Sequence, residues 1–307
     1  MAVETTEEFN KLKLDEVIAE GSSDFEDWTK LISYVEQIHH DEVDKITRVY
    51  DSFLSEFPLC YGYWKKYAEH KARLCSVEKA VQIYERAVQS VPYSVGLWVD
   101  YCSFGVSSFE DPLEICRLFE RGLSFVGMDY HCHGLWDKYI EYTYSQQHWN
   151  SLAKIYVQTL KFPTKKLHQY YESFKKLVAI WEEMGCQGSS SEEVQSQHEM
   201  DYDFKPSKDT EISHVIHELL DPSTRSKALQ KYISIGEQFY QRACDLDRKV
   251  QIFEQNIHRP YFHVKPLDDD QLQNWHRYLD LVEMEGDFDW SFGCVMLIIW
   301  SPTEEKK

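Results

Sequence analysis

Clusters of histidine and cysteine are the side chains in this sequence best suited to bind a metal ion. Residues 131–133 spell His-Cys-His, and His39-His40 form a second tight cluster. His214 and His217 lie three residues apart, which places them on one face of a helix. A structural zinc site needs four ligands, usually supplied as two spaced pairs, and each cluster lacks a second pair. We therefore expect no bound metal and no cofactor.

No motif of a known catalytic chemistry accompanies these residues. The sequence lacks a glycine-rich phosphate loop, a Gly-x-Ser-x-Gly elbow and a His-Glu-x-x-His helix. Its Asp and Glu residues total 52, but they fall on the faces of the expected helices that face solvent. We therefore expect that the protein is not an enzyme.

The net charge limits the choice of partners. Lys and Arg total 33 against 52 Asp and Glu, which gives a formal charge of −19. Such a chain repels phosphate backbones unless a local basic patch overrides its field, and basic proteins are more natural partners. The local basic cluster comprises Lys161, Lys165, Lys166, Lys175 and Lys176. A partner contact there stays open, but we interpret the cluster as the solvated start of a helix.

The elements that must position these residues are pairs of amphipathic helices. Between Tyr63 and Pro92, apolar residues recur at steps of three and four in two runs, separated by a break at 74–76. Two short helices alone cannot bury both apolar stripes. The unit therefore requires neighbouring copies of itself.

The unit recurs along the chain. The pattern Trp-x-x-Tyr marks a first helix four times, as Trp64 with Tyr67, Trp98 with Tyr101, Trp136 with Tyr139, and Trp275 with Tyr278. The centres of the second helices are Tyr50, Tyr84, Phe119 and Tyr156, at steps of 34, 35 and 37 residues. This period predicts an all-α fold, an α-solenoid of the tetratricopeptide size class. Because the aromatic residues are periodic, we interpret them as packing between helices rather than as base-stacking surfaces.

The helix motifs differ from the standard tetratricopeptide and resemble the half-a-tetratricopeptide (HAT) repeat. The first helix has Trp-x-x-Tyr, and the second has Ile-Tyr-Glu-Arg-Ala at 83–87 and Leu-Phe-Glu-Arg-Gly at 118–122. Longer segments, among them 13–32, 135–142 and 259–280, are similar to the pre-mRNA-processing factor 39 family of HAT-repeat splicing proteins.

The resemblance implies a HAT-repeat α-solenoid located in the nucleus. It also implies association with proteins of the U1 small nuclear ribonucleoprotein in 5′ splice-site recognition, with RNA contact indirect or weak. The likeness runs from about Leu12 to Trp290, so we expect only the N-terminal part of the family. In that family the C-terminal repeats support dimerisation, and their expected absence makes dimerisation of this chain doubtful.

The Glu-Arg pairs at 85–86 and 120–121 are the charged residues of the second-helix motif. They could bind a partner, but we interpret them as bridges between neighbouring repeats on the helix surface. The matching positions hold Asp-Ser at 51–52 and Val-Gln at 157–158, so no single role follows from the sequence.

Period and composition divide the chain into five segments. We expect a flexible N-terminal segment at 1–23, HAT repeats one to four with the first helix of a fifth at 24–183, and a mostly disordered insertion at 184–224. A long helix and further HAT-type helices follow at 225–288, and an atypical tail at 289–307. Much of the insertion has almost no apolar residue, so burial cannot offset its ordering entropy.

Two smaller elements lie within these segments. Tyr171 and Phe174 are expected in the Trp and Tyr places of the fifth first helix. A short helix is expected over 211–220, where it ends at the Asp-Pro of 221–222.

Prolines bracket an extended connector at 259–267, which is a further candidate for a partner contact. The candidate residues there are Arg259, Tyr261, His263 and Lys265. The acidic N-terminus predicts no signal peptide, and the longest apolar run, 294–300, is too short to span a membrane.

The first functional hypothesis is a non-enzymatic protein-interaction scaffold in pre-mRNA splicing. The alternative is an RNA-binding helical-repeat protein in RNA processing. Steep salt dependence of RNA affinity would favour the alternative, whereas capture of protein partners without RNA would favour the first.

Overall fold

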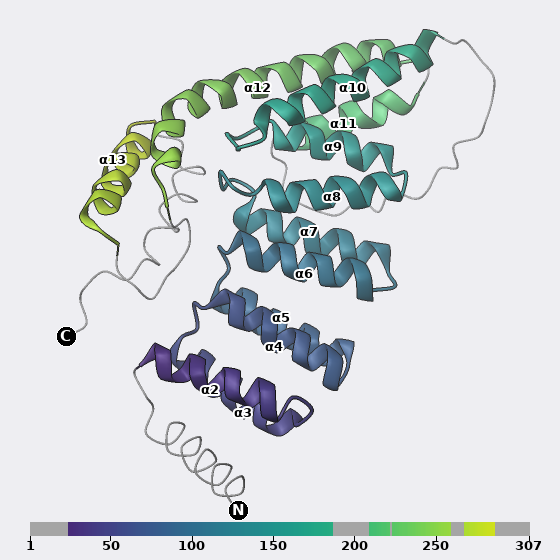
Figure 1. Ribbon diagram of the computed structural model, residues 1–307. Coiled ribbons are helices and arrows are strands. Elements are labelled where there is room, and N and C mark those ends of the chain that lie inside the picture. Colours follow the sequence, from purple (N-terminus) through teal and green to yellow (C-terminus); the bar gives the residue numbers. More distant parts are fainter. Residues whose placement is uncertain (1–23, 187–208, 222, 259–266, 286–307) are drawn as a thin grey trace, which may run out of the picture. The chain divides into compact units, whose positions relative to one another are not determined.

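A computed structural model of the chain describes residues 24–186, 209–221, 223–258 and 267–285. These residues form the helices α2 to α13 and contain no strand (Figure 1). The all-α prediction is confirmed. The helices fall into two compact units, one holding residues up to Gly127 together with those from Asn256 onwards, the other holding Met128–Gln255.

Three antiparallel helix pairs stack in the first unit, and each corresponds to one expected repeat (Figure 1). In chain order they are α2 (Phe25–Ile38) with α3 (Val43–Glu56), α4 (Tyr61–Leu74) with α5 (Val77–Ser90), and α6 (Val95–Ser108) with α7 (Pro112–Val126). The break expected at 74–76 is the turn between α4 and α5.

Short polar side chains begin several of these helices, because the first turn of a helix leaves its backbone N–H groups without partners. Asp24 accepts a hydrogen bond from the Glu26 N–H, and Ser76 accepts one from Lys79. Asp111 accepts from the Leu113 N–H, and Pro112 follows at the first helical position, where no N–H is needed. These caps set the start of each helix and hence which face it buries.

The tryptophans of the first helices are the largest buried side chains of each pair. Trp28, Trp64 and Trp98 are each at most 3% exposed. The indole N–H of Trp64 donates to the Pro58 carbonyl at 2.8 Å, and that of Trp98 donates to Pro92 at 2.7 Å. The proline that ends one repeat therefore also satisfies the buried donor of the next.

The second unit begins with another helix pair, and three further helices follow it. Its elements are α8 (His133–Ser145), α9 (Trp149–Thr159), α10 (Leu167–Cys186), α11 (Asp209–Leu220) and α12 (Arg225–Gln255). The short helix expected over 211–220 and the long helix expected from 225 are both present. α11 packs on α12 and α9, and α12 lies along α10 (Figure 1).

The aromatic pair of the fourth repeat lies on α8. Trp136 and Tyr139 are both buried, together with Leu135 beside them. The two rings are buried, as are the corresponding rings of Trp98 and Tyr101. Tyr139 is buried, as Tyr67 and Tyr101 are. Tyr139 belongs to the second unit, whereas Tyr67 and Tyr101 belong to the first.

A glycine allows α10 and α12 to approach closely. A Cβ added at Gly236 would run into the Phe174 ring. Around this point the rings of Tyr171 and Tyr240 stack with centroids 3.7 Å apart, and Phe174 meets Tyr232 at 5.0 Å. The apolar period of the sequence does not predict this role of Gly236, because a glycine inside a helical pattern adds no periodic signal.

Two aromatic positions of the second unit differ from the others in burial. Tyr170 is buried in α10 whereas Tyr171 is half-buried, so Tyr170 and Phe174 line the core where Tyr171 and Phe174 were expected to do so. Tyr156 of α9 is also only half-buried, whereas Ile155 beside it is buried. A helix register read from aromatic residues alone can therefore be wrong by one position.

The last described helix is α13 (Asp269–Glu285), which coincides with the helix expected over these residues. It buries Trp275, Tyr278 and Val282. The Gln271 amide at its start donates to the Asn256 carbonyl at 2.6 Å and accepts from the His258 N–H at 3.1 Å.

Several sequence predictions concern residues outside the described part of the chain. These are the flexible segment at 1–23, the centre of the insertion at 187–208, the connector residues Arg259, Tyr261, His263 and Lys265, and the tail beyond 285. None of the described helices is long and apolar enough to cross a membrane.

Replacing a buried tryptophan tests the packing of the repeats. Trp64→Ala should lower the free energy of unfolding by roughly 3–5 kcal/mol, because it removes a large buried ring and a satisfied N–H. Denaturant titration measures the change. Trp149→Ala is the matched control, since that ring is 42% exposed, and it should cost about 1 kcal/mol or less. Equal losses for the two variants would contradict the packing role of Trp64.

Candidate functional site

The Glu-Arg pairs of the second helices connect neighbouring repeats. Arg86 of α5 lies 2.9 Å from the Asp51 carboxylate of α3. Arg121 of α7 has its Nη2 atom 2.9 Å from both carboxylate oxygens of Glu85 in α5. In the first Glu-Arg pair the two residues act separately: Glu85 contacts the repeat that follows, and Arg86 the repeat that precedes. The interpretation as inter-repeat bridges is confirmed for Glu85, Arg86 and Arg121, and stays a prediction for Glu120.

A tyrosine of the following first helix joins each bridge. The Tyr67 hydroxyl donates to Asp51 at 3.2 Å, and the Tyr101 hydroxyl donates to Glu85 at 2.7 Å. Burial and the adjacent carboxylate raise the pKa of Tyr67 to about 12, and they raise the pKa of Tyr101 as well. Both hydroxyls therefore stay protonated and remain donors across the physiological pH range.

The arginines also cover the tryptophans. The Arg86 guanidinium lies 5.4 Å from the centre of the Trp64 ring, and the Arg121 guanidinium lies 5.2 Å from that of Trp98. We call each set of acid, tyrosine and arginine an inter-repeat clamp. The two clamps are Asp51 with Tyr67 and Arg86, and Glu85 with Tyr101 and Arg121.

The first repeat also supplies an acid to a clamp. Its sequence has Asp51-Ser52 in place of the Glu-Arg pair, and Asp51 accepts hydrogen bonds from the Tyr67 hydroxyl and from Arg86. A shorter carboxylate suffices because the tyrosine and arginine come from the next repeat. The signal was the spacing of 35 residues from Asp51 to Arg86, and pairing residues one repeat apart would have found it.

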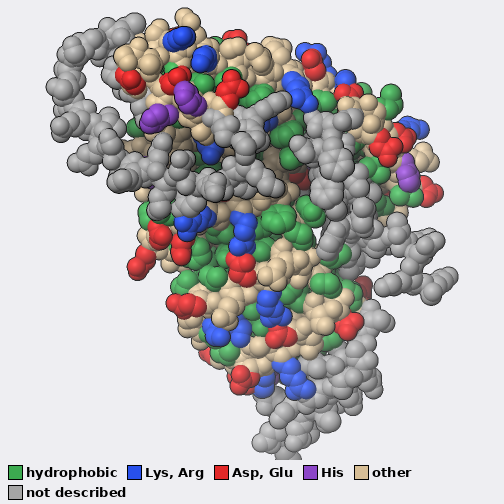
Figure 2. Space-filling model, turned by 180° about the vertical axis from the view of Figure 1, so that it is seen from behind, with side chains coloured by type: hydrophobic (Ala, Val, Ile, Leu, Met, Phe, Trp, Pro, Cys, Tyr) green, Lys and Arg blue, Asp and Glu red, His purple; other side chains and the backbone are tan. Residues whose placement is uncertain are grey.

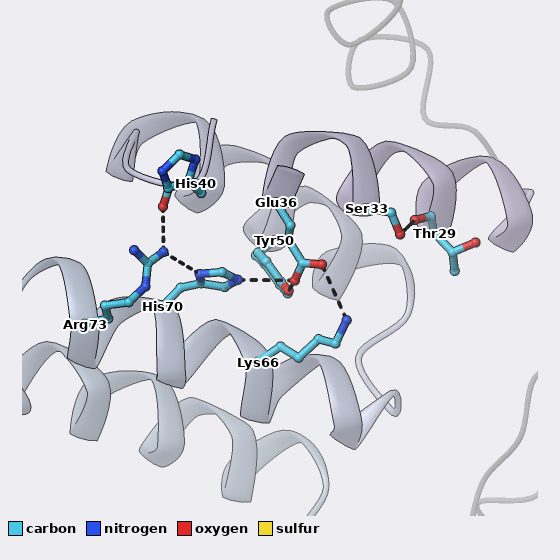
Figure 3. A network of polar contacts seen from close by, with 8 residues as sticks. All are labelled: Thr29, Ser33, Glu36, His40, Tyr50, Lys66, His70 and Arg73. Carbon is cyan, nitrogen blue, oxygen red and sulfur yellow. Dashed lines mark hydrogen bonds and ion pairs between the residues drawn. The ribbon is translucent and has the colours of Figure 1, made fainter. Parts of the chain in front are cut away.

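A second polar network joins α2, α3 and α4 around Glu36 (Figure 3). The Tyr50 hydroxyl donates to the Glu36 Oε1 atom at 2.6 Å, and His70 Nε2 lies 3.2 Å from the same oxygen. Lys66 approaches Oε2 at 3.5 Å, and Arg73 donates to the backbone carbonyl of residue 40 at 2.6 Å. The acid of this network comes from a first helix, whereas the acids of the two clamps come from second helices.

The environment of Glu36 favours its ionised form. Burial opposes ionisation, but the hydrogen bonds from Tyr50 and His70 and the charge of Lys66 outweigh that effect. Together they hold the pKa of Glu36 below its ordinary value. The network is therefore a structural contact at neutral pH, not a site for proton transfer.

The histidine clusters are held by acidic neighbours rather than gathered around a common centre. His39 Nδ1 lies 2.7 Å from Glu42, His40 Nε2 lies 3.0 Å from Asp41, and His214 Nδ1 lies 3.4 Å from Glu218. Within the described residues, no three His, Cys, Asp or Glu side chains are grouped so that they could hold a metal ion.

The His-Cys-His cluster begins α8 and is enclosed by protein. Burial raises the pKa of the Cys132 thiol, so it is a poor nucleophile and a poor ligand at neutral pH. Burial and the charge of Lys165 lower the pKa of His131. The His131 N–H donates to the Asp129 carboxylate at 2.6 Å, and burial raises the pKa of Asp129 to about 6. This arrangement stabilises a turn and offers no catalytic geometry.

The basic cluster is largely used within the chain. Lys166 pairs with Asp137 at 2.7 Å, and Lys175 pairs with Glu172 at 2.6 Å. Lys161 lies over the Phe239 ring at 5.8 Å, whereas Lys165 and Lys176 are exposed. The face seen in Figure 2 likewise shows basic, acidic and apolar side chains interspersed over the described residues, without a large patch of one sign.

The fold places the chain among the α-solenoid proteins built from HAT helix pairs. Two family models match: "PRP39 N-terminal HAT repeat" over residues 12–176 and "PRP39 C-terminal HAT repeat" over residues 248–292. The first covers more than half of the chain, so the chain belongs to the PRP39 family of HAT-repeat proteins.

Curated proteins similar to the chain carry related names. Pre-mRNA-processing factor 39-2 of Arabidopsis thaliana is 52% identical over 91% of this chain and 28% of its own length. Pre-mRNA-processing factor 39 of Schizosaccharomyces pombe is 32% identical over 90% of this chain and 46% of its own length. The U1 small nuclear ribonucleoprotein component PRP42 of Saccharomyces cerevisiae is 24% identical over 82% of this chain and 47% of its own length.

The likeness to the family also includes part of its C-terminal repeats. Most of the match is the N-terminal HAT model, and residues 248–292 match the C-terminal HAT model in addition. The apolar positions of this stretch are those of α13 and the end of α12, and they were recognised as HAT-type without being assigned to the C-terminal set. The chain spans less than half the length of the curated relatives named above.

A double-mutant cycle tests the inter-repeat clamp. Glu85→Ala and Arg121→Ala should show a coupling energy of about 0.5–1 kcal/mol, since both side chains are partly exposed and solvent screens their attraction. The matched control is the ion pair of Asp27 and Lys30 within α2, at 3.7 Å, for which we expect at most a few tenths of a kcal/mol, as for pairs on one helix. A coupling near zero for Glu85 and Arg121 would show that their contact adds nothing to the stack.

The buried carboxyl of Asp129 predicts a pH dependence of stability. Because its pKa is raised to about 6 in the fold, ionisation favours the unfolded chain, and this penalty grows as pH rises from about 4 to above 6. Asp129→Asn keeps an oxygen for the His131 N–H and cannot ionise. The variant should gain on the order of 2 kcal/mol relative to the wild type between pH 4 and pH 7, measured by urea unfolding across that range. A constant difference between the two proteins would refute the raised pKa.

Proposed function

We propose that the chain acts as a non-enzymatic protein-interaction scaffold in pre-mRNA splicing. The observation that carries the proposal is the PRP39 HAT match along the stacked helix pairs. Similarity to a protein named as a U1 small nuclear ribonucleoprotein component supports association with that particle. Within it, we place the action of the chain at 5′ splice-site recognition, and the chain itself in the nucleus.

The side chains favour contacts with protein over contacts with RNA. RNA readers without strong sequence preference stack bases on exposed aromatic rings and hold phosphates with unpaired cations. Here the periodic tryptophans are buried, and two of the five lysines of the basic cluster, Lys166 and Lys175, pair with carboxylates. The formal charge of −19 also opposes a polyanion. RNA contact is therefore proposed as indirect or weak.

The match to a C-terminal HAT repeat removes the stated reason for doubting dimerisation of the chain. The reason for doubting it was the expected absence of the C-terminal repeats, and residues 248–292 match the model of such a repeat. The helix that buries Trp275 and Tyr278 would then be the part of this chain to examine in a dimer. Sedimentation equilibrium of the purified chain at several concentrations gives its oligomeric state directly.

Affinity purification from nuclear extract tests the proposed function. A tagged chain should recover proteins of the U1 small nuclear ribonucleoprotein after nuclease treatment, because the contacts proposed are with protein. Trp64→Ala tests whether recovery requires the folded stack. This destabilised variant should recover less U1 protein than the wild type. Recovery that disappears on nuclease treatment would instead favour the RNA-binding alternative.

RNA affinity of the isolated chain provides a separate measurement. We expect binding of generic single-stranded RNA with a dissociation constant at or above the non-specific range of about 10⁻⁴–10⁻⁶ M at physiological salt. The physical reason is the acidic field of the chain. Fluorescence anisotropy with a labelled oligonucleotide measures it, and nanomolar affinity would move the RNA-binding hypothesis to first place.

A further inference from the structure

In the three helix pairs between residues 24 and 127, most of the exposed large apolar side chains lie at the turns within the pairs. Between residues 24 and 127, five large apolar side chains of the described chain are exposed by more than a third, and four of them lie at the turn within a helix pair. They are Ile38 at 48%, Val77 at 37%, Val106 at 42% and Leu113 at 42%. The fifth, Phe125, stacks on Trp98 with centroids 5.7 Å apart.

These residues belong to three successive repeats. Ile38 is the last residue of α2, Val77 is the first of α5, and Val106 and Leu113 flank the turn between α6 and α7. In Figure 1 the α2–α3, α4–α5 and α6–α7 turns lie on the same side of the stack, at the right. The four residues therefore lie at or beside turns of the same edge of the stack, which we call the turn edge.

These positions lie outside the buried stripes of their helices. The buried stripe consists of other residues, such as Ile83 and Tyr84 in α5 and Ile115 and Phe119 in α7. At Leu113 the backbone N–H donates to Asp111, and the side chain is 42% exposed. Apolar side chains that are exposed together, without a role in the core, are typical of interaction sites.

The turn in the second unit shows the same feature. Tyr144 near the end of α8 is 61% exposed and Trp149 at the start of α9 is 42% exposed, and their rings meet edge to face at 5.7 Å. Exposed aromatic residues at the matching turn of a fourth repeat show that the feature belongs to the repeat rather than to one pair.

Carboxylates surround the turn edge in the first unit. Asp44 lies near the first turn, Glu78 follows Val77, and Glu110 and Glu114 flank the third turn, all of them exposed. Of the nearby cations, Arg73 pairs with Asp41 at 3.1 Å and Lys45 pairs with Glu42 at 2.9 Å, whereas the exposed Lys79 donates to the neutral Gln82 at 3.1 Å. The edge therefore combines apolar side chains with a surplus of negative charge.

We propose that the turn edge binds a basic amphipathic helix of a protein partner. Its apolar stripe would cover Ile38, Val77, Val106 and Leu113, and its Lys and Arg residues would face the flanking carboxylates. The spacing suits such a ligand, because stacked helices lie about 8–10 Å apart and a helix advances roughly 10 Å per heptad. That the partner is a splicing protein rests on the proposed function; the chemistry of the edge does not.

Other occupants fit the edge less well. A phosphate backbone would meet carboxylates of its own sign and find the nearby Lys45 and Arg73 already paired. A second copy of this chain would place one acidic edge against another. An acidic amphipathic helix fails for the same reason.

Peptide binding tests the proposal without knowledge of the partner. The probe is a fluorescein-labelled helix of about five turns, built from Leu on one face and Lys on the other. A second peptide has the same composition scrambled so that no apolar face forms. Anisotropy titration of the full chain should show tighter binding of the amphipathic peptide than of the scrambled one.

Matched variants locate the binding. Val77→Ser combined with Leu113→Ser should weaken binding of the amphipathic peptide by about tenfold, since apolar burial at two places is lost. The control is Ile180→Ser combined with Ile252→Ser, two positions of α10 and α12 that are 49% and 66% exposed. This control should bind as the wild type does. Thermal melting confirms that both variants remain folded.

Charge variants test the second half of the proposal. Glu110→Gln combined with Glu114→Gln should weaken binding about two- to fivefold at low salt, and the dependence of affinity on salt should become shallower. Equal binding of the scrambled peptide, equal loss in the Ile180/Ile252 control, or unchanged affinity in the Val77/Leu113 variant would each overturn the proposal. The proposal would also be overturned if the Val77/Leu113 variant changed the affinity for a labelled RNA, or the self-association of the chain, and left the affinity for the peptide unchanged.

The two proposals can fail separately. Recovery of U1 proteins from nuclear extract without any binding of the amphipathic peptide overturns the turn edge and leaves the proposed function standing. Peptide binding that the Val77/Leu113 variant weakens, without recovery of U1 proteins, overturns the proposed function and leaves the turn edge as a docking surface.

Discussion

The contact between consecutive helix pairs is the constraint on which the stack depends, because no pair can bury its aromatic stripe alone. Tyr50 stacks on Tyr67 of the next repeat with centroids 5.1 Å apart, and Tyr84 stacks on Tyr101 at 4.8 Å. Burial of such rings contributes several kcal/mol each, whereas a partly exposed ion pair contributes about 0–1 kcal/mol. Aromatic burial therefore supplies most of the stability of the stack. The clamps fix how neighbouring repeats align, because an acid, a tyrosine and an arginine from three helices meet in one register only.

The clamps also determine which residues remain available to a partner. Three charged residues of the second-helix motif, Glu85, Arg86 and Arg121, contact neighbouring repeats. In the three helix pairs between residues 24 and 127, most exposed large apolar side chains lie at the turns within the pairs, beside exposed carboxylates. A scaffold built in this way keeps its stack and its docking surface on different residues, so a change at a turn can alter binding while the stack stays folded.

The second unit departs from the simple period where α10 and α12 replace a short pair. Their contact depends on Gly236, where any side chain would enter the Phe174 ring. The hydroxyl of Tyr232 donates to the Ala153 carbonyl of α9 at 2.9 Å, which ties the long helix to the preceding pair. α10 and α12 therefore form a helix pair in which α12 is the second helix, although α11 lies between them in the sequence.

The sequence by itself determined the repeat. Its period and its Trp-x-x-Tyr motif predicted the helix pairs closely, because burial of a periodic stripe is a local requirement. Tertiary structure alone decided which residues meet across repeats. Asp51 became a clamp residue and Tyr170 replaced Tyr171 in the core. The cause is that each of these roles depends on the position of a helix some 35 to 70 residues away, roughly one or two repeats, and no local pattern records that position.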